Sequence, residues 1–303
     1  MNNKIVIIGC GNVGMSYAYA LLNQRTNVNE LVLIDINQER TIGEAMDLNH
    51  CLAFAPSKIN IKAGDYQDCH DAKIIYLAAG VNQKPGESRT DLIKKNSEIF
   101  KTIIEKVMVT GFDGIFLVAT NPLDTMTYIT YKYSKLKPNQ VIGTGTSLDT
   151  ARLRYLVGSK LNINPKNIHG YVIGEHGDSE FVPYSSMTVG SQNISNFLNQ
   201  EELETISTDV RNAAYEIINR KGATYYGIGM ASVRITNAIL SDENTIITVS
   251  AYDTVNDIYI GLPHVIGSSG IIKKIEIDLN DEETNKLQNS IKVIKATIQS
   301  LEE

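Results

Sequence analysis

The stretch Gly9-Cys10-Gly11-Asn12-Val13-Gly14 decides the fold of this chain. It follows an apolar run, Ile5–Ile8, and precedes the helical apolar spacing of residues 17–22. A second apolar run, Leu31–Ile34, ends at Asp35, about 20 residues beyond the last glycine. Strand, glycine turn, helix, strand and acid in this order are the fingerprint of a dinucleotide-binding unit. The pattern therefore predicts a dinucleotide site at the start of the chain.

Each residue type in this unit has a physical reason. Gly9 allows the tight turn, Gly11 lets a pyrophosphate approach the backbone, and Gly14 lets the helix pack on the strand. The free amide groups at the helix start then face the phosphates. Asp35 can accept hydrogen bonds from both ribose hydroxyls and repels a 2′-phosphate, which favours NAD over NADP. The alternative, a glycine turn with a surface aspartate, is disfavoured because spacing, flanks and acid all agree.

Composition narrows the class of protein. The 303 residues suit about two domains, and 43% apolar with 20% charged residues is ordinary for a soluble globular protein. The net charge of −6 argues against nucleic acid as a partner, and no apolar run approaches the ~18 residues of a membrane span. The start of the chain carries no signal sequence. The three scattered cysteines form neither a disulfide framework nor a metal site, so we expect a cytoplasmic protein without a metal.

The order of elements predicts two domains. A weak strand-like run at 59–61 and further runs at 73–79, 114–119 and 141–142 alternate with helical spacing as far as residue 143, which completes six. This predicts an α/β, doubly wound, parallel six-stranded sheet (a Rossmann fold) in residues 1–143, the NAD-binding domain. Residues 144–303 change character and predict an α+β substrate domain with helices at 148–160, 201–240 and 281–301. Its strand-like runs lie at 170–173, 245–251, 258–261 and 273–277.

Four polar segments could carry chemistry. His176 stands between two glycines after a strand, and Asp149 and Arg152 are three residues apart on a predicted helix. The loop 82–89 and the segment 120–124 both follow parallel strands, at the sheet edge where ligands bind. Taken singly, these segments are equally well explained as a surface histidine, a solvated ion pair, a solvated loop and a helix-capping turn.

Together the four segments and the glycine loop resemble the lactate/malate dehydrogenase family, over essentially the whole chain. The resemblance implies an NAD-dependent oxidoreductase that interconverts pyruvate and L-lactate. It implies that His176 is the catalytic histidine, Asp149 its carboxylate partner, Arg152 the carboxylate-binding arginine and Arg89 the arginine of a mobile loop. The substrate residues that it implies are Gln83, Arg89, Asn121, Asp124, Arg152 and Thr224. The cofactor residues are Gly9, Gly11, Val13, Gly14, Asp35, Arg40, Tyr66, Gly80, Thr102, Ala119, Asn121 and Thr144.

The chemistry of these side chains agrees with such roles. A protonated His176 can give a proton to a ketone oxygen, because imidazole titrates near neutral pH. Asp149 would hold the ring in one tautomer and stabilise its charged form. Arg152 offers a planar fork that grips a carboxylate at two points. Arg89, on a loop, could arrive with the substrate, polarise its carbonyl group and exclude water.

Other functions remain open at this point. A malate enzyme needs a cation for the second carboxylate of oxaloacetate, and this chain has the neutral Gln83 in the loop, so we favour pyruvate. A longer, branched 2-oxo acid is the next alternative. A non-catalytic NAD-binding protein is an alternative of another class, although such a protein would not need the catalytic set.

Arg154 and His169 lie outside the catalytic set. The sequence alone favours two ordinary surface residues. The resemblance implies instead that they bind fructose 1,6-bisphosphate, an allosteric effector, at a subunit interface of a homotetramer, where two-fold symmetry would duplicate the pair.

Overall fold

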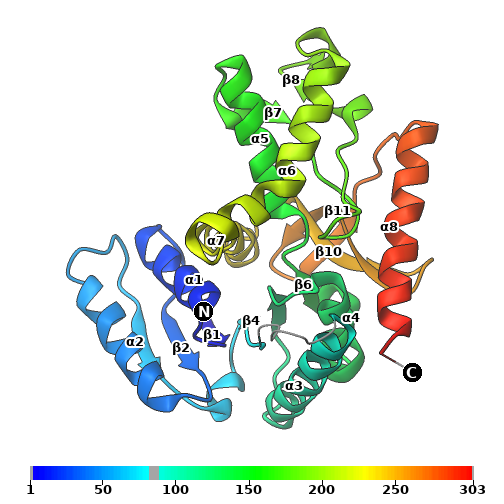
Figure 1. Ribbon diagram of the computed structural model, residues 1–303. Coiled ribbons are helices and arrows are strands. Elements are labelled where there is room, and N and C mark those ends of the chain that lie inside the picture. The colour runs from blue at the N-terminus through cyan, green and yellow to red at the C-terminus, as the bar shows by residue number, and fades with distance from the viewer. Residues whose placement is uncertain (1–2, 82–88, 302–303) are drawn as a thin grey trace.

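The computed structural model describes residues 3–81 and 89–301 (Figure 1). Within these residues a nine-stranded sheet crosses the molecule in the order β12-β11-β10-β6-β5-β4-β1-β2-β3, and a second sheet has three short strands. Helices cover both faces of the large sheet (Figure 1). The fold class predicted from the sequence is confirmed.

The first six strands are parallel and form the predicted doubly wound sheet. In spatial order they run β3-β2-β1-β4-β5-β6, which is the strand order of a dinucleotide-binding fold. Side chains of β1 alternate between the two faces: Ile5 and Ile7 join one core, Val6 and Ile8 the other. Their bounds are β1 (Lys4–Ile8), β2 (Glu30–Ile34), β3 (Asn60–Ala63), β4 (Ile74–Leu77), β5 (Ile115–Val118) and β6 (Val141–Gly143).

Two layers of helices bury this sheet. One face is covered by α1 (Asn12–Asn23), α2 (Gln38–Cys51) and α7 (Tyr226–Leu240), and α1 packs directly on α7. The other face is covered by α3 (Arg89–Val109) and α4 (Leu123–Ser134). Because both faces are covered, the strands are continuously apolar, as the sequence predicted.

The second half adds a helical layer and antiparallel strands. The helices α5 (Ser147–Leu161) and α6 (Gln200–Lys221) pack together beside the small sheet, and α8 (Asp281–Gln299) lies against β11. The small sheet contains β7 (Ile168–His169), β8 (Thr188–Val189) and β9 (Gln192–Asn193), and the antiparallel strands are β10 (Thr245–Asp253), β11 (Ile258–Gly267) and β12 (Gly270–Lys274). Short 3-10 helices are η1 (Tyr66–Cys69), η2 (Pro138–Gln140), η3 (Pro165–Asn167), η4 (Tyr184–Ser186) and η5 (Ile194–Asn196).

Three details differ from the sequence prediction. The helical stretch 201–240 is two helices, because Gly222 adopts φ +83° and ends α6. Residues 170–173 do not form a strand, and Ile173 pairs only with Phe181 in an isolated bridge. The antiparallel strands do not form a sheet of their own: Ser250 of β10 pairs with Gly143 of β6, so they extend the first sheet.

No helix in the described part of the chain is long and apolar enough to cross a membrane.

Candidate active site

The glycine loop between β1 and α1 is fixed by close backbone contacts. Gly9 adopts φ +105°, and a Cβ built on it would lie 2.4 Å from the backbone nitrogen of Ala79. A Cβ on Gly14 would lie 2.0 Å from the carbonyl oxygen of Gly9. At Gly11, by contrast, no described atom lies within 4 Å of such a Cβ. Gly9 and Gly14 are therefore needed for packing, whereas Gly11 leaves open space beside the start of α1, where a pyrophosphate would fit.

Asp35 is held next to this loop at the end of β2. Its carboxylate accepts hydrogen bonds from the backbone nitrogens of Cys10 (2.7 Å) and Asn37 (3.0 Å). Burial and the nearby Asp35 raise the pKa of the Cys10 thiol to about 12, so Cys10 is an inert apolar residue of the turn. The carboxylate of Asp35, the open space at Gly11 and the amino end of α1 lie together, and these residues fit NAD.

The other predicted cofactor residues are spread along the carboxyl edge of the sheet and its helices. Ala119 and Thr144 follow β5 and β6, and their backbone nitrogens bond to Leu77 and Val118. Val13 lies in the first turn of α1, Gly80 follows β4, Asn121 is exposed after β5, and Tyr66 begins η1. Arg40 is exposed on α2 and pairs with Glu44, and Thr102 is exposed on α3 with its hydroxyl bonded to the Glu98 carbonyl.

His176 lies on the loop that follows residue 173. The loop begins at Gly174, which adopts φ +100° and exchanges backbone hydrogen bonds with Gly261 of β11 at 2.9 and 3.0 Å. The Nδ1 atom of His176 lies 2.7 Å from the Oδ2 atom of Asp149 on α5. Asp149 is 1% exposed, whereas a quarter of the His176 side chain (25%) reaches solvent. The ring is thus hydrogen-bonded through Nδ1 to Asp149, and part of it remains open to solvent.

Arg152 completes this group from the next turn of α5. Its Nη1 atom donates to Oδ1 of Asp149 at 2.6 Å. Burial disfavours the charged form of Asp149, but His176 and Arg152 outweigh it and lower the pKa of the carboxyl group. Burial also disfavours the charged form of His176, but the Asp149 carboxylate prevails and raises the pKa of the imidazole to about 9.

Asp124, predicted to bind substrate, lies behind His176. Its Oδ2 atom accepts the backbone N–H of His176 at 2.8 Å, and its Oδ1 atom accepts the hydroxyl of Ser250. The residue is 3% exposed, and burial, opposed by these hydrogen bonds, raises the pKa of its carboxyl group to about 6. Each carboxylate oxygen of Asp124 thus accepts a hydrogen bond from the protein, and Asp124 links the His176 loop to β10.

The remaining predicted substrate residues are less fully described. Gln83 lies outside the described residues. Arg89 is the first residue of α3, and only its backbone is described. Thr224 is half-buried in the link between α6 and α7.

The predicted effector residues are linked through Gly170, the residue that follows His169. Arg154 of α5 donates its Nε–H to the carbonyl oxygen of Gly170 at 3.3 Å, and its guanidinium group lies 5.7 Å from the Tyr171 ring centre. Burial lowers the pKa of Arg154. His169, on β7, is exposed and directly precedes Gly170.

Sequence reasoning missed two residues of this region. Ser250 supports Asp124 from β10, far along the chain. Glu180 is 6% exposed, and it offers a carboxylate oxygen within 4.8 Å of ligating atoms of both Asp149 and His176. Glu180 stands four residues after His176, but it follows the loop without a spacing or motif that would have marked it.

Comparison with known proteins agrees with both the cofactor-binding part and the His176 part of the structure. Residues 3–143 match the model of the lactate/malate dehydrogenase NAD-binding domain, and residues 146–303 match that of the α/β C-terminal domain of the same family. The chain belongs to the lactate/malate dehydrogenase family. It is an NAD-dependent oxidoreductase.

Individual relatives match over nearly their whole length. The chain is 49% identical to L-lactate dehydrogenase 1 of Bacillus anthracis, across 98% of this chain and 97% of the relative. Among solved structures, a lactate dehydrogenase from a Medee basin deep-sea metagenome is 49% identical with a TM-score of 0.97, across 100% and 99% of the two chains. The ligand-bound minor L-lactate dehydrogenase of Enterococcus mundtii is 44% identical with a TM-score of 0.97, across 99% and 98%.

Proposed function

We propose that the protein is an L-lactate dehydrogenase that interconverts pyruvate with NADH and L-lactate with NAD⁺. Residues 1–143 would hold the cofactor, and residues 144–303 would supply most of the substrate contacts. The observation that carries this proposal is the joint placement of His176 and Arg152 on one buried carboxylate, Asp149. The comparison with relatives named as lactate dehydrogenases supports the same substrate.

The contacts of Asp149 support the roles proposed for His176 and Arg152. Bound NADH would supply the hydride for the ketone carbon. Because Asp149 occupies Nδ1 of His176, Nε2 is the nitrogen that gives a proton to the developing alkoxide. Arg152 uses Nη1 on Asp149, which leaves the rest of its guanidinium fork for the substrate carboxylate. Arg89 would close the site with the substrate and exclude water.

The proton on His176 sets the pH dependence of the reaction. Pyruvate reduction consumes that proton, and lactate oxidation needs the neutral imidazole. With the pKa of His176 at about 9, kcat/KM for pyruvate should hold at neutral pH and fall as pH rises through about 9. In the same range kcat/KM for lactate should rise. Initial rates in both directions between pH 6 and 10.5 test this, and a pyruvate limb that already falls near pH 6.5 would contradict it.

The substrate choice is tested by a panel of 2-oxo acids. Gln83 has no charge to meet the second carboxylate of oxaloacetate, so pyruvate should be reduced far better than oxaloacetate. NADH oxidation with pyruvate, oxaloacetate and 2-oxoisocaproate distinguishes the candidates, and Gln83→Arg should shift preference toward oxaloacetate. A wild-type preference for oxaloacetate would overturn the role of Gln83. Tight NADH binding without turnover of any of the three acids would indicate a non-catalytic protein.

We further propose a homotetramer that is activated by fructose 1,6-bisphosphate. Arg154 bonds to the carbonyl oxygen of Gly170, the residue after His169, and its guanidinium group lies over the Tyr171 ring. At a two-fold interface these cations would occur twice, facing two phosphates. An effector that fits only the assembled active form would then favour that form.

The effector proposal is tested by steady-state kinetics with and without fructose 1,6-bisphosphate at pH 6 and 8. The effector should lower the apparent KM for pyruvate, more at pH 6, and Arg154→Gln should abolish the effect. Arg220→Gln is the matched control, because Arg220 is an exposed arginine whose ion pair lies within α6. Pyruvate curves that do not change with effector at either pH would leave Arg154 and His169 as ordinary surface residues.

A further inference from the structure

Glu180 is held on the same tight loop as the catalytic histidine. Ile173 and Phe181 exchange two backbone hydrogen bonds, of 2.9 and 3.0 Å, which close the loop between them. Within it, the backbone nitrogen of Glu180 bonds to the carbonyl oxygen of Gly177 at 3.1 Å. The loop thus fixes the position of Glu180 relative to His176 by backbone contacts.

The Glu180 side chain is largely buried, and its carboxyl group has no hydrogen-bond partner among the described residues. Glu180 is 6% exposed, and one of its oxygens lies within 4.8 Å of atoms of Asp149 and His176. Asp149 receives the hydrogen bonds of both His176 and Arg152, whereas none of the described side chains donates to or pairs with Glu180. Asp149 therefore takes the hydrogen bonds of His176 and Arg152, whereas Glu180 has the charge of Arg211 nearby, without a hydrogen bond to it.

This arrangement makes the ionisation of Glu180 dependent on His176. Burial, reinforced by the Asp149 carboxylate, raises the pKa of Glu180 to about 9. The Asp149 carboxylate also raises the pKa of His176, so both groups lose their protons on the alkaline side of neutrality. Two groups so close titrate as a pair.

We propose that Glu180 is a positioning residue whose own proton sets how strongly the His176–Asp149 pair holds its proton. At neutral pH Glu180 is a neutral acid and Asp149 is the only carboxylate beside the ring. At alkaline pH Glu180 gives its proton to solvent, and the new carboxylate keeps His176 charged. The proposal rests on the proposed role of His176 as proton donor.

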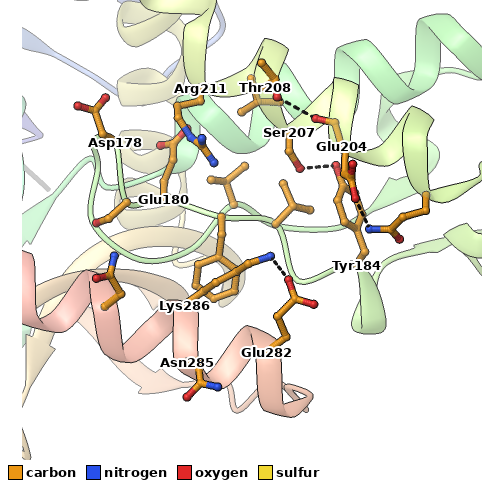
Figure 2. Close-up of a pocket in the computed structure, with 17 residues that line it drawn as sticks. Asp178, Glu180, Tyr184, Glu204, Ser207, Thr208, Arg211, Glu282, Asn285 and Lys286 are labelled. Atoms are coloured by element: carbon orange, nitrogen blue, oxygen red, sulfur yellow. Dashed lines mark hydrogen bonds and ion pairs between the residues drawn. The ribbon is translucent and has the colours of Figure 1, made fainter.

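A cavity of about 680 Å³ gives this proton a route to solvent. Figure 2 shows Glu180 beside Arg211 of α6 on one wall, and Asp178 and Glu204 at exposed positions around it. Across the cavity, Glu282 and Lys286 of α8 pair with each other at 2.6 Å. The charged and titratable groups around Glu180 and the ring are Asp149 and Arg152 of α5, Arg211 of α6, His176 itself, and Asp124 of α4 behind the ring.

The proposal predicts the shape of the His176 titration in the wild-type protein. Loss of the first proton leaves either charged His176 beside the Glu180 carboxylate, a charged pair, or neutral His176 beside neutral Glu180. The charged pair then holds the second proton more tightly, so the curve spreads over more than one step. A histidine with a non-titrating neighbour would give a simple one-proton curve. Imidazole NMR signals of isotope-labelled protein, followed from pH 6 to 10.5, measure this without substrate.

The decisive variant is Glu180→Gln, which keeps the shape and removes the ionisation. The His176 curve should become a single step, with its midpoint lowered by roughly one pH unit. The alkaline limb of kcat/KM for pyruvate should move down by the same amount. Glu204→Gln is the matched control, because Glu204 lines the same cavity but is exposed and hydrogen-bonded to Gln200. Its curves should coincide with those of the wild type.

Two results would overturn the proposal. One is a one-proton His176 curve in the wild type, and this result decides the question even where Glu180→Gln fails to fold. The other is a folded Glu180→Gln protein with the wild-type midpoint. Absence of pyruvate turnover in the wild type would instead refute the proposed function, and the NMR curves would still report on Glu180.

Discussion

The glycine loop and the His176 loop, the two halves of the proposed active site, are stabilised in different ways. The glycine loop is held mainly by close backbone packing: a Cβ on Gly14 would meet the carbonyl group of Gly9, and a Cβ on Gly9 would meet backbone atoms of Ala79 after β4. His176 depends on residues that are distant in sequence, 27 positions to Asp149 and 52 to Asp124, and Asp124 in turn on Ser250, 126 positions away. A loop held by backbone packing tolerates almost no added atom. A loop held by side-chain hydrogen bonds can lose one of these bonds while the others remain.

The largest expected effect separates the two halves. His176→Asn removes the proton donor and should lower kcat for pyruvate about 10²- to 10⁴-fold. NADH affinity, measured by fluorescence titration, should stay near the wild-type value, because the glycine loop and Asp35 are untouched. Near-normal turnover in this variant would remove His176 from the proton-transfer role.

The next effect tests how rigid the glycine loop is. Gly9→Ala would place a Cβ 2.4 Å from the Ala79 nitrogen at φ +105°, and it should lower the free energy of unfolding by about 2–4 kcal/mol. Gly43→Ala is the control: Gly43 lies within α2 with no described atom within 4 Å of a new Cβ, and alanine there should stabilise by about 0.5–1 kcal/mol. Equal unfolding midpoints in urea for both variants would contradict the packing argument.

A smaller effect is expected behind the histidine. Asp124→Asn removes the negative charge and one of the two acceptors that engage His176 and Ser250, and it should lower kcat/KM for pyruvate about 10-fold. NADH affinity should not change. Asp257→Asn is the comparison, since the Asp257 carboxylate accepts from Tyr252 outside the site. Equal kinetics in the two variants would show that the Asp124 carboxylate is dispensable.

The smallest effect concerns cofactor selectivity. Asp35→Ser keeps a short polar side chain but loses the charge, so NADH should bind several-fold more weakly and NADPH several-fold better. The ratio of kcat/KM values for the two cofactors measures this. An unchanged ratio would mean that the carboxylate of Asp35 does not bind the ribose hydroxyls.

The same contrast explains what could be predicted from the sequence. The six-stranded parallel sheet was predicted correctly, because apolar runs and the Gly9–Gly14 turn are contiguous signals. The break at Gly222 was missed although a glycine after a basic last turn is a local signal for the end of a helix. The extension of the sheet through Ser250 was missed because tertiary pairing decides it. In the site, resemblance supplied His176, Asp149 and Arg152, which the fold brings together. Glu180 could not be predicted, because its importance comes from burial beside a carboxylate and not from its neighbours in sequence.

The single strand pairing between Ser250 and Gly143 has a consequence for protein engineering. Ser250 also donates to Asp124, which holds the backbone of His176, so one residue of β10 joins the sheet edge to the catalytic loop. A hybrid enzyme spliced at residue 143 from two members of the family would draw Asp124 from one parent and both Ser250 and His176 from the other. Such hybrids should keep the His176 loop in its position where the two parents agree at positions 124 and 250.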